Sequence, residues 1–164
     1  MDRAAGRRRL VGVLAALAVS SFCASVAAAQ SYGNWVVQSF GRFVEAVTSD
    51  QQGATLALAC DGRTCVFYID NDTSCIDGTE YFVLLNAPSG AAHVTLECKE
   101  VANSRGRTHV FAFAGGESIE EAVATQSIVS IAFPMADGSF RVSRFDTSGY
   151  AGAVAAMRAL LARR

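Results

Sequence analysis

The chain has 164 residues, of which 51% are hydrophobic, and it carries 14 basic and 15 acidic side chains. This balance supplies no strongly basic surface, which argues against a nucleic-acid-binding protein and against a protein held on anionic membranes by charge. With two prolines and no internal repeat, the sequence is neither a Pro-rich linker nor a repeat array.

The first 29 residues have the three parts of a secretory signal peptide. Four arginines precede an apolar stretch at residues 10–19, and small side chains stand at Ala27 and Ala29. A signal peptidase reads these two positions, so we predict cleavage after Ala29. The sequence therefore predicts an exported protein, either periplasmic or secreted and surface-associated.

Other readings of this segment stay open. Residues 10–29 are long enough to span a bilayer as an uncleaved anchor. Cys23 invites a lipoprotein interpretation, but Phe22 precedes it where a lipoprotein signal needs a small residue. The arginines at 7–9 are loosely similar to a twin-arginine signal, and general secretory export remains the prediction.

Cleavage leaves residues 30–164, a length of 135 residues that suits one domain and is too short for two. The removed segment contains four of the basic and one of the acidic residues, so this domain carries a net charge of −4. For such a domain we predict no nucleic-acid partner and, once the signal is removed, no membrane span.

Short segments rich in β-branched and aromatic residues, separated by turn residues, follow one another along this domain. Asp61-Gly62 supplies the turn chemistry of a tight hairpin. The predicted strands cover residues 35–40, 43–48, 55–60, 65–69, 81–85, 93–98, 108–113, 127–133 and 139–145. They predict a mainly β fold, an antiparallel β-sandwich or open barrel.

Two of these strands carry a prediction about their faces. Residues 81–85 are apolar throughout, so this strand is expected to be buried on both faces. Residues 139–145 alternate, with Phe140 and Val142 on the predicted apolar face and Phe145 breaking the alternation at the end.

Two helices complete the predicted fold. Ser118 is expected to cap a short helix over residues 119–124. Thr147 and Ser148 are expected to cap a second helix over residues 149–162. Three- and four-residue spacing places on one face of that helix the side chains of Val154, Met157, Leu160 and Leu161. This apolar stripe predicts that the C-terminal helix packs on the sheet.

Four cysteines remain after the predicted cleavage: Cys60, Cys65, Cys75 and Cys98. An even number in a small exported domain indicates two disulfides, for which three pairings are open. The hairpin favours Cys60 with Cys65 and therefore Cys75 with Cys98. A zinc site is the rival interpretation, but no Cys-x-x-Cys pair is present, and we predict no metal.

The candidate binding residues lie in two polar loops. Asp70, Asp72 and Asp77 lie in an acidic loop at residues 70–80 whose start resembles a calcium loop. The sixth and twelfth positions of an EF-hand would hold Gly and Glu, which this loop lacks, so a solvated loop is expected, with weak calcium binding as the alternative. Arg105 and Arg107 form a basic hairpin tip that could contact a phosphate or an acidic partner; exposed charge at a turn is the alternative.

Catalytic chemistry has little support in the sequence. His93 and His109 are the only histidines, and no Gly-x-Ser-x-Gly nucleophile turn accompanies them. The cysteines are expected to be in disulfides, so no free thiol nucleophile is predicted. We therefore expect a protein that is not an enzyme and has no cofactor. The alternative is a small periplasmic hydrolase that uses one of these histidines as its base.

Three features of the chain carry a family resemblance: Trp35-Val36-Val37, the paired cysteines, and the strand–turn–helix of residues 140–153 with its Gly149-Tyr150 pair. With these features the chain resembles the invasion-associated locus B family of exported proteobacterial proteins, in which a Gly-Phe pair stands at the position of Gly149-Tyr150. Residues 56–62 and 68–70 are also similar to a type VI secretion-associated periplasmic protein family. Ser39 stands where the first family has a cysteine, so that family's disulfides are not carried over.

This resemblance implies a small periplasmic or surface-exposed β-domain that acts by contact, and it brings no catalytic residue. We therefore expect a non-enzymatic envelope protein that binds a protein or cell-envelope partner, with a role in host interaction in some family members. An inhibitor of a host hydrolase is a variant of this hypothesis, in which the rigid loop between Cys60 and Cys65 is the wedge.

Overall fold

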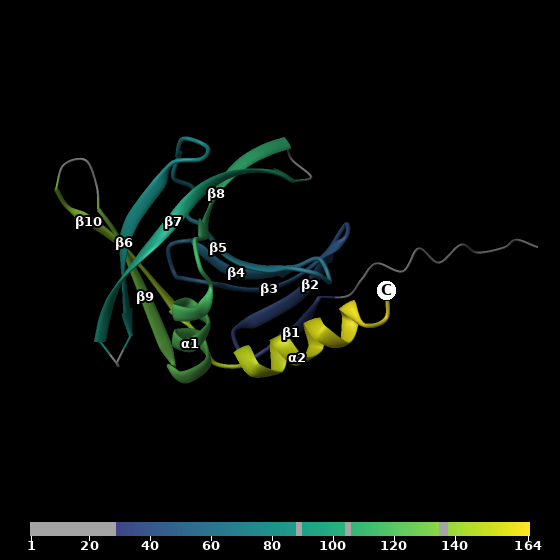
Figure 1. The fold of residues 1–164 in the computed structure, drawn as a ribbon. Helices are drawn as coiled ribbons and strands as arrows, with labels where there is room; N and C mark the ends of the chain where they lie inside the picture. The colour runs from purple at the N-terminus through teal and green to yellow at the C-terminus, as the bar shows by residue number, and fades with distance from the viewer. Residues whose placement is uncertain (1–28, 88–89, 104–105, 135–137) are drawn as a thin grey trace, which may run out of the picture.

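A computed structural model describes residues 29–87, 90–103, 106–134 and 138–164. The predicted signal peptide lies outside these residues except for Ala29. The described part of the chain forms ten strands and two helices (Figure 1). They are β1 (Gln30–Tyr32), β2 (Trp35–Phe40), β3 (Phe43–Ser49), β4 (Thr55–Cys60), β5 (Cys65–Asp70), β6 (Glu80–Ala87), β7 (Gly90–Asn103), β8 (Gly106–Phe113), α1 (Glu117–Thr125), β9 (Ile128–Pro134), β10 (Phe140–Asp146) and α2 (Tyr150–Leu161).

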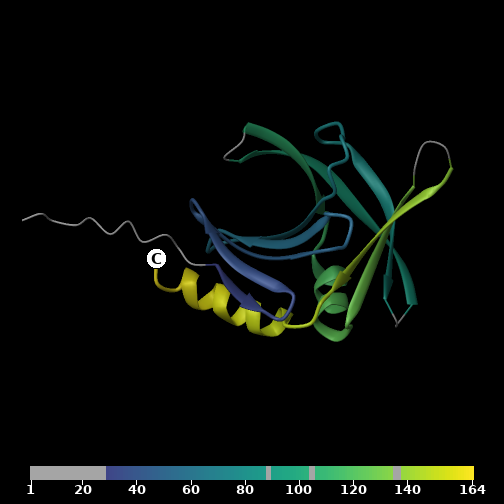
Figure 2. The same ribbon diagram turned by 180° about the vertical axis from the view of Figure 1, so that it is seen from behind.

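All ten strands belong to one antiparallel sheet in the order β1-β2-β3-β4-β5-β8-β7-β6-β9-β10. Most neighbours follow each other in the chain because short turns join them, whereas β8 returns to pair with β5 and β9 returns to pair with β6. The sheet curls strongly between β5 and β7 (Figures 1 and 2). The predicted mainly β fold with one internal and one C-terminal helix is confirmed.

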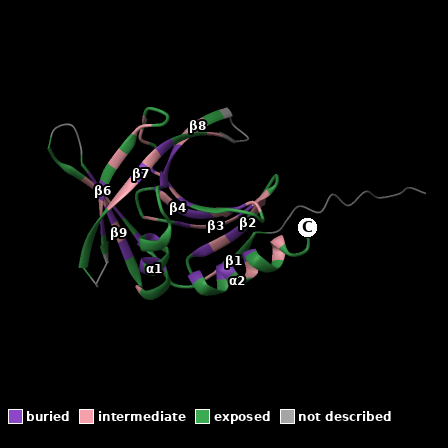
Figure 3. Ribbon diagram, in the orientation of Figure 1, coloured by how far each residue is buried: buried purple, intermediate pink, exposed green. Residues whose placement is uncertain are grey.

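The core lies on one face of this curled sheet, where the two helices cover it (Figure 3). Its largest fully buried side chains include Trp35, Leu56, Ile69, Leu96, Ile131 and Phe145. The helix α2 lies against β2 and β3, with Val154 and Met157 buried and Leu160 and Leu161 partly buried. The predicted packing of the C-terminal helix is therefore confirmed, because the side chains of its apolar stripe are buried or partly buried against the core.

The faces of β10 are the reverse of the prediction. Ser143 and Phe145 are buried, whereas Phe140 is 57% exposed. The register with β9 explains the reversal, since Ser143 lies opposite Ile131 and Phe145 opposite Val129, both fully buried. Opposite residues in an antiparallel pair share a face, so the apolar face of β9 decides which side of β10 turns inward.

The expectation that β6 is buried on both faces is also wrong. Val83 and Leu85 are buried, but Phe82 is 68% exposed and Leu84 is only half-buried. Neither helix of the described chain covers the second face of β6, so the side chains of this strand alternate between the core and the solvent. Because β6 is apolar at every position from 81 to 85, its solvent-facing side carries the large aromatic ring of Phe82.

Neither helix begins with the predicted side-chain cap. Gly116 stands at the N-cap of α1 and Gly149 at the N-cap of α2, and neither helix has a side-chain cap hydrogen bond. Ser118 lies within α1. The hydroxyl of Thr147 donates instead to the backbone carbonyl of Gln126, so this side chain ties the start of α2 to the end of α1.

The two ends of the domain are locked together at Gly33 and Gly149. The backbone N–H of Asn34 donates to the carbonyl of Ser148 at 3.1 Å, and the rings of Trp35 and Tyr150 lie 5.2 Å apart. Both glycines have positive φ, +58° and +95°, which L side chains adopt at a cost. The β1–β2 turn and the entrance of α2 therefore fit against each other without side chains between them.

Candidate functional site

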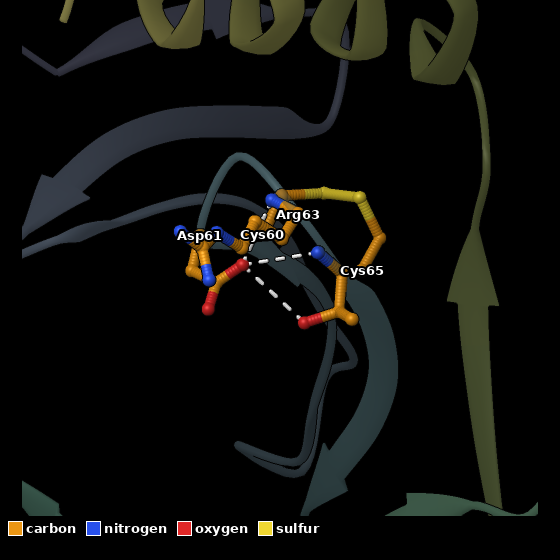
Figure 4. The surroundings of a disulfide bond; sticks show 5 residues. Cys60, Asp61, Arg63 and Cys65 are labelled. Atoms are coloured by element: carbon orange, nitrogen blue, oxygen red, sulfur yellow. Dashed lines mark hydrogen bonds between the residues drawn. A yellow bond between two sulfur atoms is a disulfide. The ribbon is translucent and has the colours of Figure 1, made fainter.

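The hairpin between β4 and β5 is closed by a disulfide, as predicted. Cys60 and Cys65 are directly opposite each other in the strand pair, with Cα atoms 4.1 Å apart. Within the loop, Asp61 Oδ1 accepts the backbone N–H groups of Arg63 and Thr64 at 3.0 Å each (Figure 4). The loop is exposed except for Asp61, which is half-buried. Its rigidity comes from these bonds and from the disulfide.

The carboxylate of Asp61 gives this loop a pH dependence. Hydrogen bonds from the backbone of Thr64 and then of Arg63 hold its pKa below the ordinary value of 3.8, because they favour the charged form. A depressed folded-state pKa stabilises the fold above the unfolded-state value, and that contribution is lost as the pH falls through the folded-state pKa.

We therefore expect Asp61 to titrate below pH 3.8 in an NMR titration of the side-chain carboxyl carbons. We further expect Asp61→Asn to make the unfolding free energy less sensitive to pH below about pH 4. Asp72, an exposed carboxylate in another loop, provides the matched variant Asp72→Asn. An unchanged acid slope in Asp61→Asn would contradict the role of these bonds.

The loop at residues 70–80 is attached to β7 by a disulfide and by hydrogen bonds. Cys75 and Cys98 form the second disulfide, Gly78 N–H donates to the Cys98 carbonyl at 2.9 Å, and Asp77 Oδ1 accepts the N–H of Glu100 at 2.7 Å. Both disulfides therefore have the pairing that the hairpin favoured. The loop is a structural attachment, so its freedom to close around a ligand is small.

The candidate binding residues do not form one site. Asp70 Oδ1 accepts the N–H of Asp72 at 3.2 Å, a local turn contact. Asp77 and Arg107 both converge on Glu100, the first at its backbone and the second at its carboxylate, 3.0 Å away. Arg105 lies outside the described residues. Within those residues no group of three acidic, His or Cys side chains is placed to hold a metal ion.

The two histidines are far apart. His93 is exposed on β7, and His109 on β8 lies opposite Glu100. His93 and Glu100 are seven residues apart on the same strand, which is about 23 Å when extended, and an odd separation puts them on opposite faces of the sheet. The two histidines therefore cannot serve one reaction centre together.

An exposed apolar surface on the outer side of β6, β9 and β10 was missed by sequence reasoning. The strand registers place Leu84, Ala132 and Val142 in one row across the three strands. In the next row Pro134 lies opposite Phe140, and Phe82 is two residues from Leu84 on the same face. We call these six residues the apolar outer face. Its two phenylalanines are 68% and 57% exposed.

A groove of about 480 Å³ borders the apolar outer face at the seam between β3 and β10. Ile128, Val142 and Arg144 line one side of it, and the turn after β3 lines the other. Asp146 also lines it, and hydrogen bonds from Ser148 and then from Asn34 hold the pKa of that carboxyl below its ordinary value. Arg144 has no hydrogen bond or ion pair among the described residues. The groove thus continues the apolar outer face and adds to it one positively charged side chain, Arg144, that has no partner among the described residues.

Comparisons of the chain with protein-family models, with curated proteins and with solved structures each found no match. The family resemblance stays a prediction from the motifs. Across the part of the chain that is described, neither helix combines the length and apolar character needed to cross a membrane. The two disulfides indicate an oxidising, exported environment.

Proposed function

We propose that this protein is a non-enzymatic envelope protein of the periplasm or cell surface that binds a protein partner through the apolar outer face. One observation carries the proposal: Phe82 and Phe140, 68% and 57% exposed, lie on the same side of the sheet. Contiguous exposed apolar surface of this kind is typical of an interaction site.

The energetics favour a partner that covers both rings. Burying a phenylalanine side chain gains about 1.5–3 kcal/mol, and aromatic side chains in the centre of a surface patch are frequent hot spots of binding. The surrounding Leu84, Ala132 and Val142 add no charge that a partner would have to neutralise. The strands also hold the two rings in fixed positions, so little conformational entropy is lost on binding.

The family resemblance supports the same assignment, because it implies an exported β-domain that acts by contact. The two disulfides support it as well, since a rigid scaffold stable in an oxidising compartment suits a surface that must persist outside the cytoplasm. The acidic loop and the Cys60–Cys65 hairpin then stiffen the domain, and the acidic loop also supports β10, since Thr73 Oγ1 accepts a hydrogen bond from Arg141 at 3.1 Å.

A photo-crosslinking amino acid placed at Phe82 tests this proposal in the native envelope. We expect a discrete adduct with a protein partner, and no such adduct from the same group at Ala155, which is exposed on α2. Added wild-type protein should suppress the adduct. The Phe82→Ser/Phe140→Ser variant should compete at least about tenfold less well, because it lacks both rings.

Both rings are exposed, so the double variant is expected to keep the wild-type Tm, which checks that it is folded. Equal competition by the wild type and the double variant would exclude the apolar outer face as the contact surface. Adducts of equal intensity from Ala155 would show unspecific association. The mass of the adduct separates a partner protein from a second copy of this chain.

A further inference from the structure

The free edge of β10 is an unused pairing surface. Among the described strands β10 is the last in the sheet, and of these only β9 pairs with it. Its C-terminal end is occupied, because the hydroxyl of Thr48 donates to the carbonyl of Asp146 at 3.2 Å. Residues 140–144 keep backbone groups that no described strand pairs with, and such an edge is a template for another strand.

The sequence of β10 limits the registers in which a second copy of β10 could pair with this edge. In an antiparallel pair of two identical strands, opposite residues share a face. The twofold axis must therefore lie between the two copies of one residue, which is then opposite itself. An axis at Arg141 or Arg144 sets like charges against each other. An axis at Ser143 sets the ring of Phe140 against the carboxylate of Asp146. Each of these three registers is opposed by charge or desolvation. An axis at Phe140 brings only residues 138–142 of the described chain opposite each other, which leaves Arg144 outside the pair.

An axis at Val142 gives a complementary register. Val142 then lies opposite itself, and Phe140 of each copy lies opposite Arg144 of the other, twice over. A guanidinium over an aromatic ring is a favourable pair, and Arg144 has no other partner among the described residues. On the inner face Arg141, which donates to Thr73 Oγ1 at 3.1 Å, lies opposite Ser143, whose buried hydroxyl has no hydrogen-bond partner among the described residues.

We propose that two copies of this protein pair antiparallel along β10, with the twofold axis through Val142. The two sheets become continuous, and their apolar outer faces join into one surface twice as wide. This surface would present the two Phe82 rings to a partner, one from each copy, and each Phe140 ring beside the Arg144 guanidinium of the other copy. The pairing concerns the edge of β10 and the binding of a partner concerns the face, and Phe140 takes part in both. Arg144→Glu leaves both rings in place, so it tests the pairing separately from the proposed function.

Cysteine cross-linking tests the register directly. In a Val142→Cys variant purified from the periplasm of an expressing bacterium, the two new thiols lie opposite each other, with Cβ atoms about 4.5–5.5 Å apart. We expect a disulfide-linked dimer that reductant separates. Phe82→Cys is the matched control, since Phe82 is on the same outer face but two strands away from the edge, and it should form no disulfide-linked dimer.

Sedimentation equilibrium of the wild-type protein tests the association without cross-linking. From about 1 µM to about 1 mM, the mean mass should rise from one chain towards two. Arg144→Glu should weaken the dimer at least about tenfold, because it removes both ring–guanidinium contacts and adds a carboxylate beside each ring. Amide hydrogen exchange in residues 140–144 should slow as the dimer forms.

Wild-type protein that stays monomeric over this range would overturn the proposal. Equal cross-linking of Val142→Cys and Phe82→Cys would also overturn it, since association would then involve the face and not the edge. Circular dichroism of each variant shows whether the fold is retained. If Arg144→Glu is folded and dimerises as strongly as the wild type, the register through Val142 is wrong.

Discussion

Replacing Gly149 by alanine is expected to lower the free energy of unfolding by at least about 3 kcal/mol. The added Cβ would lie 2.0 Å from the carbonyl oxygen of Tyr32 and 2.9 Å from the backbone nitrogen of Gly33. Both contacts are with backbone, so no side-chain rotation relieves them. The φ of +95° at this position adds a second penalty that any L side chain would meet.

Gly53→Ala is the matched control for this prediction. Gly53 has nearly the same φ, +88°, but a Cβ there meets nothing within 4 Å. It should cost only about 1 kcal/mol, and the difference between the two variants measures the steric part alone. Urea unfolding followed by circular dichroism gives both values. Equal losses in the two variants would show that the contact between the chain ends is looser than described.

This contact gives the Gly149-Tyr150 pair a structural explanation. Gly149 admits the backbone of Tyr32, and Tyr150 packs on Trp35 and on Phe67, with ring centroids 5.2 and 6.2 Å apart. Burial raises the pKa of Tyr150 to about 12. The Gly149-Tyr150 motif, which contributed to the family resemblance, therefore has a structural role: it joins the first strands to the last helix.

Most strands could be predicted because their signal is local. Alternating side chains and turn residues identify a hairpin without knowledge of the rest of the chain, and the Cys60–Cys65 disulfide followed from the hairpin between β4 and β5. The helix caps were wrong because Ser118 and Thr147 have the right chemistry in the wrong place. A glycine stands at the N-cap of both helices instead, and Gly149, with φ of +95°, has a backbone conformation that favours glycine.

The faces of β6 and β10 could not be read from their own residues. In β10 each face carries a phenylalanine, so the strand alone does not decide between Phe140 and Phe145. The decision comes from β9, a neighbour in the sheet, and in β6 it comes from the absence of a helix over one side. The apolar outer face is built from three strands that are not all consecutive, so only the sheet order reveals it.

The 70–80 loop and the 105–107 tip were selected as candidate sites for their charge, and the Cys60–Cys65 hairpin for its rigidity. In the structure Asp77 and Arg107 support β7 and β8 by bonding to Glu100, and Asp61 stiffens its own hairpin. Charged residues in a loop of a small domain serve the backbone of that loop as readily as a ligand. The proposed function uses instead the apolar outer face, which is recognised by large apolar side chains that are exposed to solvent.

The two disulfides are expected to differ in what they contribute to stability. Cys75 and Cys98 are 23 residues apart, whereas Cys60 and Cys65 are 5 apart. In the loop-entropy description, the longer loop stabilises by about 3 kcal/mol and the shorter by about 2 kcal/mol. The Cys75→Ala/Cys98→Ala variant should therefore lose more unfolding free energy than the Cys60→Ala/Cys65→Ala variant in urea denaturation.

A structural effect should widen this difference beyond the entropy of the unfolded chain. Without the Cys75–Cys98 bond, the 70–80 loop is held to β7 by hydrogen bonds such as those of Gly78 and Asp77. Amide exchange should then quicken at residues 98–100, while the amides of β4 and β5 stay as protected as in the wild type. The β4–β5 hairpin keeps its strand pairing after loss of its own disulfide. A larger loss of unfolding free energy in Cys60→Ala/Cys65→Ala than in Cys75→Ala/Cys98→Ala would therefore contradict this account.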